Sequence, residues 1–195
     1  MATELHLNTP LAPPLPLRRF SVEEYHQLGE LGVLTSEDKV ELLEGWIVEK
    51  MNQLPIHGFI VGVLTEFFQK VLPSEFSIRC QLPITAERSE PEPDIAIIRG
   101  SHSDFRDRHP CGTDCRLVIE VADTSLDRDR SKTAIYREAG VHEYWIFNVA
   151  EKCVECYVLA NSPSNIPATI IAGDSQVSAT INEVKVTLDL KQIFS

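Results

Sequence analysis

The fold is decided by the stretch Pro91-Glu-Pro-Asp-Ile-Ala-Ile-Ile98, by Leu117-Val-Ile-Glu-Val121 downstream of it, and by Lys132 in the polar segment that follows. Both apolar runs have the length and composition of buried strands. Asp94 borders the first run and Glu120 interrupts the second, where an unpaired carboxylate would cost free energy. A bound cation is one candidate for offsetting that cost.

Length and composition indicate one globular domain. The chain has 195 residues, of which 43% are hydrophobic, and this is enough to bury a sizeable core. Residues 1–16 are rich in proline and leucine without helical or alternating periodicity, so we expect a flexible leader there and a single domain over 17–195. No apolar run approaches the roughly 20 residues of a membrane span, and no basic residue precedes the leucine-rich start, which favours a cytoplasmic protein.

Hydrophobic periodicity predicts an α/β architecture. We expect helices over about 21–29, Glu37–Leu43, His57–Val71 and Asp127–Ala139, and strands over Trp46–Met51, Phe76–Leu82, Ile95–Ile98, Leu117–Val121 and Glu143–Asn148, followed by short antiparallel strands between 153 and 188. The order strand, helix, strand over 117–148 is that of a crossover unit in a largely buried sheet.

The net charge of −11 argues against nucleic-acid binding by bulk electrostatics, because that affinity comes from lysine and arginine. Between Arg99 and Arg137, however, lie eight of the 18 basic residues against seven acids. If Asp94 and Glu120 hold a metal ion, the guanidinium groups of this segment are available to phosphates. The alternative is a solvated surface of mixed charge.

The five cysteines favour reduced thiols, because their number is odd and no secretory signal precedes them. The pairs Cys111/Cys115 and Cys153/Cys156 could supply four zinc ligands, but the second pair lies in a strand-like run where residues three apart point to opposite faces. Small buried thiols are the simpler interpretation.

The acids and the lysine can be combined into one site. If the strands that carry Asp94 and Glu120 are neighbours, both carboxylates can reach one Mg²⁺ at about 2.1 Å. Lys132 lies twelve residues after Glu120, on a helix that packs back over the sheet, so its ammonium can reach the same point. Tyr136 is one turn further along that face.

Ordered motifs across the chain carry a resemblance to a known family. They are Phe20-Ser-Val-Glu-Glu-Tyr25, Val40-Glu-Leu-Leu-Glu-Gly45, His57, Pro93-Asp94, Glu120-Val121, Lys132 with Tyr136, and Gly140-Val-His-Glu-Tyr-Trp145. In these the sequence resembles the PD-(D/E)xK nuclease superfamily, and more closely its large bacterial family of putative restriction endonucleases. The resemblance extends from Phe20 to Val149.

The resemblance implies a restriction-endonuclease-like mixed β-sheet flanked by α-helices. It also implies a Mg²⁺-dependent endonuclease acting on DNA, with Mn²⁺ as a substitute metal. Asp94, Glu120 and the backbone carbonyl of Val121 would be the metal ligands, and Glu41 would join them from an N-terminal helix. The superfamily motif places lysine two residues after the acid, where this chain has Ala122, so Lys132 would substitute from the helix.

Three further residues are secondary candidates: His57 at a helix start, Tyr136, and Glu44, which shares a helical stripe with Glu41 if that segment is helical. Because double-strand cleavage needs two active sites, we expect a homodimer. Two other functions remain open at this point: a nuclease-like domain that binds DNA or a protein without cutting, and a hydrolase of another phosphate ester.

Overall fold

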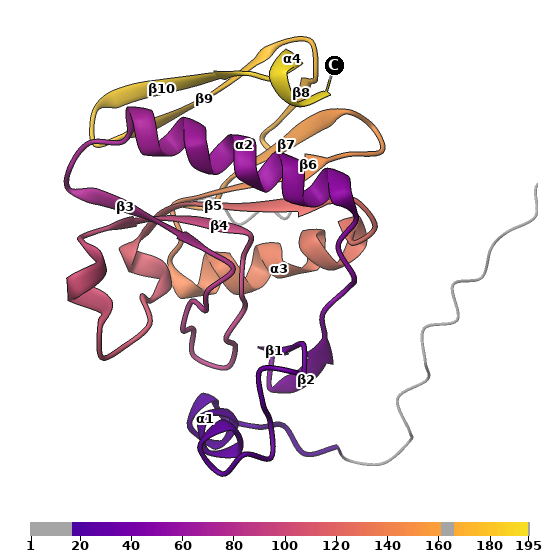
Figure 1. Ribbon diagram of the computed structural model, residues 1–195, viewed down its shortest axis with the longest axis vertical. Helices are drawn as coiled ribbons and strands as arrows, with labels where there is room; N and C mark the ends of the chain where they lie inside the picture. Colours follow the sequence, from indigo (N-terminus) through magenta and orange to yellow (C-terminus); the bar gives the residue numbers. More distant parts are fainter. Residues whose placement is uncertain (1–16, 161–165, 195) are drawn as a thin grey trace, which may run out of the picture.

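The computed structural model describes residues 17–160 and 166–194, so the predicted leader over 1–16 lies outside the described residues. Its centre is a six-stranded sheet in the order β3-β4-β5-β6-β7-β8 (Figure 1). The strands are β3 Phe76–Cys80, β4 Ile95–Arg99, β5 Cys115–Ala122, β6 Glu143–Asn148, β7 Cys153–Val158 and β8 Thr169–Ala172. Of the neighbouring pairs, β5 and β6 are parallel and the others are antiparallel, which makes the sheet mixed as predicted.

The parallel pair depends on helix α3 (Leu126–Ala139), which connects β5 to β6. Parallel neighbours need such a crossover, because a tight turn can only reverse the chain. The helix ends at Gly140, whose φ of 89° is the left-handed conformation that favours glycine at this position. The predicted crossover unit over 117–148 is therefore confirmed.

The two faces of the sheet are covered by different elements. Helix α2 (Pro55–Val71) lies on one face together with the hairpin of β9 (Gln176–Ile181) and β10 (Val184–Asp189), and α3 lies on the other (Figure 1). Along α2, the fully buried side chains Ile60, Leu64 and Phe68 recur at four-residue spacing, so one apolar stripe faces the sheet. A short helix, α4 (Lys191–Phe194), closes the same core.

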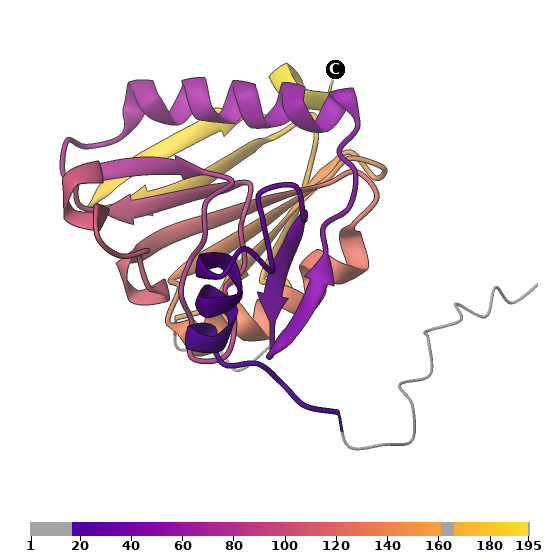
Figure 2. The same cartoon turned by 60° about the horizontal axis from the view of Figure 1, so that its bottom comes forward.

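The N-terminal elements lie together below α2 in both views of the chain (Figures 1 and 2). Helix α1 (Val22–Glu30) begins with a capping box, in which the Ser21 side chain accepts from the amide of Glu24 and the Glu24 carboxylate accepts from the amide of Ser21. Strands β1 (Val40–Leu43) and β2 (Trp46–Glu49) form an antiparallel hairpin after it.

The predicted helix over Glu37–Leu43 is wrong, because Val40–Leu43 is strand β1. Glu44 and Gly45 both have positive φ, 51° and 80°, as in the two-residue turns that join hairpin strands. A Cβ on Gly45 would also lie 2.6 Å from that of Arg19, so only glycine fits this turn. Gly45 therefore forms part of the hairpin turn between β1 and β2.

The polar connection between β4 and β5 contains two short 3-10 helices, η1 (His102–Phe105) and η2 (Gly112–Asp114). All five cysteines are free thiols, and within 17–160 and 166–194 no group of three or more His, Cys, Asp or Glu is arranged to hold a metal ion. The cysteine-based zinc site is thus excluded for these ranges. No helix among the same residues has the length and apolar character needed to cross a membrane.

Candidate functional site

Asp94 and Glu120 meet because β4 and β5 are antiparallel neighbours, with Ile95 opposite Ile119. The backbone amide of Asp94 donates to Oε2 of Glu120 at 3.2 Å. Both side chains are buried and line a small pocket of about 70 Å³. The expectation that the two acid-bearing strands lie side by side is therefore confirmed.

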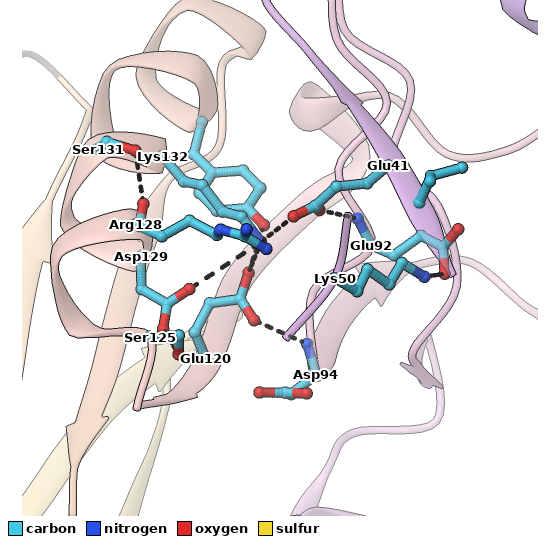
Figure 3. A network of polar contacts seen from close by, with 12 residues as sticks. Glu41, Lys50, Glu92, Asp94, Glu120, Ser125, Arg128, Asp129, Ser131 and Lys132 are labelled. Carbon is cyan, nitrogen blue, oxygen red and sulfur yellow. Dashed lines mark hydrogen bonds and ion pairs between the residues drawn. The ribbon is translucent and has the colours of Figure 1, made fainter. Parts of the chain in front are cut away.

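Lys132 reaches the same point from α3 (Figure 3). Its Nζ lies 3.0 Å from Oε1 of Glu120, 3.1 Å from Oε1 of Glu41 and 4.0 Å from Oδ1 of Asp129. The lysine side chain is only 5% exposed, and the three carboxylates are equally well buried. One buried ammonium is thus shared among carboxylates from two strands and from its own helix.

Burial and charge act against each other in this cluster. Burial alone would lower the pKa of Lys132, but the carboxylates of Glu120, Glu41 and Asp129 outweigh it and hold that pKa above its ordinary value. Burial raises the pKa of Glu120 well above its usual range, although Lys132 opposes this shift. For Asp129, burial raises the pKa to about 6 against the same opposition. Lys132 therefore stays protonated, while burial disfavours the charged forms of Glu120 and Asp129.

Asp94 is oriented by two donors on one oxygen. Its Oδ2 accepts from the backbone amide of Val121 at 2.8 Å and lies 3.0 Å from Nε2 of His57, the first buried residue of α2. The pKa of His57 is raised overall, because the Asp94 carboxylate outweighs the burial that would lower it. His57 therefore positions Asp94, while the other oxygen of Asp94, Oδ1, has no hydrogen bond to any described residue.

Two buried tyrosines, Tyr136 and Tyr144, pack together next to Glu120. The Tyr136 hydroxyl donates to Oε1 of Glu120 at 2.9 Å, and the Tyr144 hydroxyl donates to the backbone carbonyl of Asp129 at the same distance. Both rings are fully buried and lie 4.9 Å apart. The secondary candidate Tyr136 thus holds the carboxylate in place from behind.

The donor set suits a hard divalent cation, with two carboxylates rather than three available to it. Asp94 presents its free Oδ1, Glu120 is the second oxygen donor, and Val121 lines the same pocket. Mg²⁺ commonly binds through one or two carboxylates and retains waters for its other positions. Lys132 contacts both Glu41 and Glu120, and among the described residues no group of three or more acidic, histidine or cysteine side chains is arranged to hold a metal ion. The residues therefore fit Mg²⁺ with water ligands and do not form a cage.

Glu41 arrives from a strand, which corrects the expectation that it lies on an N-terminal helix. Strand β1 is tied to the segment before Asp94, since the amide of Glu90 donates to the carbonyl of Leu42, and the amide of Glu92 donates to Oε2 of Glu41. Glu41 is 2% exposed, so its carboxylate is buried in the cluster. Glu44 does not join the cluster, because its carboxylate accepts from Arg88.

Asp129 was missed by sequence reasoning. It is buried, and its Oδ2 accepts from the Ser125 hydroxyl at 2.5 Å at the start of α3. The signal was present in the sequence, because Asp129 precedes Lys132 by three residues and so shares its face of a helix. The same segment carries many other charged residues, so this spacing did not stand out in the sequence.

Comparison with known proteins agrees with this architecture. The model of a family described as "Putative restriction endonuclease" (Uma2) matches residues 22–188. The chain belongs to this family. A similar fold is found in the crystal structure of a putative nuclease belonging to DUF820 from Anabaena variabilis ATCC 29413, with a TM-score of 0.72 and 18% identity over 92% of this chain and 98% of that one. No curated protein matches the chain.

Membership of the restriction-endonuclease family confirms the predicted resemblance and the fold class. The family match covers both acids, Lys132 and the β1–β2 hairpin. At 18% identity, the Anabaena structure supports the fold alone.

Proposed function

We propose that this protein is a metal-dependent endonuclease that hydrolyses phosphodiester bonds of DNA. The observation that carries the proposal is the buried Lys132 ammonium, held 3.0 Å from Glu120 on the strand next to Asp94. Two carboxylates and an amine at one point are the groups that metal-assisted phosphodiester hydrolysis requires. Membership of the restriction-endonuclease family supports the same reaction class.

Asp94 and Glu120 would hold Mg²⁺, or Mn²⁺ in its place, with the carbonyl of Val121 as a third ligand. When bound, the ion would supply a Lewis acid for the phosphate and an acidified water. Lys132 remains protonated, so it donates hydrogen bonds to charge that develops on the phosphate and does not act as the base. His57 and Tyr136 hold the two carboxylates in their orientations.

The test is cleavage of supercoiled and single-stranded DNA with Mg²⁺ or Mn²⁺. Asp94→Asn and Glu120→Gln should lower the rate by at least about a hundredfold, since each removes a charge from the metal site. The matched control is Glu66→Gln, because Glu66 is 75% exposed on α2. Equal rates for wild type and both site variants would dismiss the assignment.

A second candidate function is a nuclease-like domain that binds DNA without cutting it. One observation favours it: Lys132 already engages both Glu41 and Glu120, so the amine competes with a metal ion for those oxygens. The two functions differ in metal binding. A rise in melting temperature with Mn²⁺ that is lost in Asp94→Asn supports the nuclease, and no metal effect supports the binding domain.

The proposed assembly follows from the proposed reaction, because cleavage of both strands of a duplex needs two active sites. We therefore propose a homodimer, and we also propose that it acts on DNA in the cytoplasm. Light scattering coupled to size-exclusion chromatography measures the assembly directly. A monomer that still cuts both strands would contradict the dimer.

A further inference from the structure

A second and much larger pocket adjoins the candidate site. It has a volume of about 1300 Å³ and is lined by α1, by the turn before β1, by the segment 105–109 and by Arg79 of β3. Lys50 and Glu92 line both this pocket and the small pocket around Asp94. Their ion pair lies beside Glu41 in Figure 3, so the two pockets are neighbours on either side of it.

Arg79 is a buried cation without a counter-ion. It is 8% exposed, and its Nε is buried without a hydrogen-bond partner. Its Nη2 contacts Nδ1 of His109 at 3.2 Å, and no carboxylate among residues 17–160 and 166–194 lies within ion-pair distance of it. Since arginine does not lose its proton in proteins, the charge stays in place at a cost in free energy.

The acids of this pocket do not neutralise Arg79. Glu90 accepts from the Thr85 hydroxyl and is paired with His26, and Glu92 is paired with Lys50. The remaining acids of the lining are all exposed to solvent: Glu23, Glu30, Asp38 and Asp107. The guanidinium therefore faces a pocket whose nearby carboxylates are already engaged.

The neighbours of Arg79 suit an anionic ligand. Arg106 and Arg108 line the same pocket and are exposed; Arg108 is paired with Asp114, so Arg106 is the residue of the two that adds positive charge to the pocket. The pKa of His109 is lowered, mainly by burial and further by Arg79, so its neutral Nδ1 accepts from the guanidinium. A guanidinium matches the geometry of a phosphate better than any other side chain does.

We propose that Arg79 binds a backbone phosphate of the nucleic acid strand, adjacent to the phosphate that is cut. The site deepens the proposed nuclease function and rests on it for the identity of the strand. The scissile phosphate would lie at Asp94 and Glu120, and the strand would pass the Lys50–Glu92 ion pair into the larger pocket. The bound phosphate then supplies the counter-ion that Arg79 lacks among the described residues.

The experiment measures binding without cleavage. A labelled single-stranded oligonucleotide is titrated in EDTA and followed by fluorescence anisotropy with wild type, Arg79→Met and the control Arg99→Met. Arg99 is exposed and lies outside the lining of both pockets. We expect Arg79→Met to raise Kd about tenfold and to reduce the slope of log K against log salt by about one, with Arg99→Met unchanged.

A second measurement separates ligand binding from a structural role. Inorganic phosphate should raise the melting temperature of wild type and leave that of Arg79→Met unchanged, while Arg79→Met should melt no lower than wild type without phosphate. If Arg79→Met does not fold, Arg79→Lys replaces it and should show a smaller phosphate response than wild type. Wild-type affinity and salt slope in the folded variant would overturn the proposal.

Repeating the titration on Glu120→Gln distinguishes the two proposals. If the protein does not cut DNA, the Arg79 effect on binding still appears in this background and the phosphate site stands. If the protein cuts DNA and the Arg79 variant binds as wild type does, the nuclease stands and the phosphate site is refuted.

Discussion

Lys132 and Arg79 are both buried cations on the face of the sheet that carries α3, yet their surroundings are opposite. Lys132 has three carboxylates within 4.0 Å, whereas Arg79 contacts a single neutral histidine. The first charge is compensated by the chain itself, and the second is left for a ligand to compensate. A buried charged residue therefore indicates a ligand-binding site only where the fold provides no counter-ion for it.

The difference arises from the elements that carry each cation. Lys132 lies on α3, which crosses directly over Glu120 and also carries Asp129 on the same face. Arg79 lies on β3, the edge strand of the sheet, where the residues across from it belong to a polar connection rich in arginine. The charge of Lys132 is compensated because it lies on a helix that packs on the sheet. The charge of Arg79 is not compensated, because a loop covers the sheet there.

The largest effect is expected when the compensated cation is removed. Lys132→Met leaves the buried carboxylates of Glu41, Glu120 and Asp129 without the cation they share, and should lower the free energy of unfolding by about 3–5 kcal/mol. Urea denaturation measures the change. Lys70→Met is the control, because Lys70 is 75% exposed and its variant should remain within about 0.5 kcal/mol of wild type. A loss below about 1 kcal/mol in Lys132→Met would show that the ion pairs of Lys132 do not stabilise the folded state.

An intermediate effect should depend on pH. The pKa of Asp129 is raised from 3.8 to about 6, mainly by burial and against the attraction of Lys132. A raised carboxyl pKa stabilises the folded state at low pH, and this contribution is lost as the pH rises through about 6.

Asp129→Asn removes this titration. Relative to the variant, wild type should therefore lose about 2–3 kcal/mol of stability between pH 4 and pH 7.5. Urea denaturation of both proteins at the two pH values measures this difference. An identical difference at both pH values would mean that Asp129 ionises as an ordinary carboxyl group.

The smallest effect is expected for the uncompensated cation. Arg79→Met replaces a buried charge without a partner by an apolar side chain of similar length, so the free energy of unfolding should change by less than about 1 kcal/mol or increase. Urea denaturation in a buffer free of phosphate measures this change. A loss comparable to that of Lys132→Met would erase the distinction between the two cations.

Much of the site was predictable from local pattern. Asp94 and Glu120 were found because acids beside or within apolar strands are costly, and Lys132 because helical spacing placed it over the sheet. Glu41 was found only through a family resemblance and was assigned to the wrong element. Its segment has charges at helical spacing, but the turn at Glu44 and Gly45 and the pairing of β1 with β2 override that pattern.

The phosphate site proposed at Arg79 left no trace in the sequence. Arg79 and His109 lie 30 residues apart, and neither belongs to a recognisable motif. Their meeting depends on how the connection between β4 and β5 folds back over the edge of the sheet.

The sequence by itself determined the α/β architecture, the crossover helix and three polar residues of the candidate site, because periodicity and burial cost act over a few neighbouring residues. Only the tertiary structure decided which charges find partners. That outcome depends on distances of 3 to 4 Å between elements far apart in the chain, and no local pattern encodes such distances. Only the tertiary structure therefore gives Lys132 its carboxylate counter-ions and leaves Arg79 without one among the described residues.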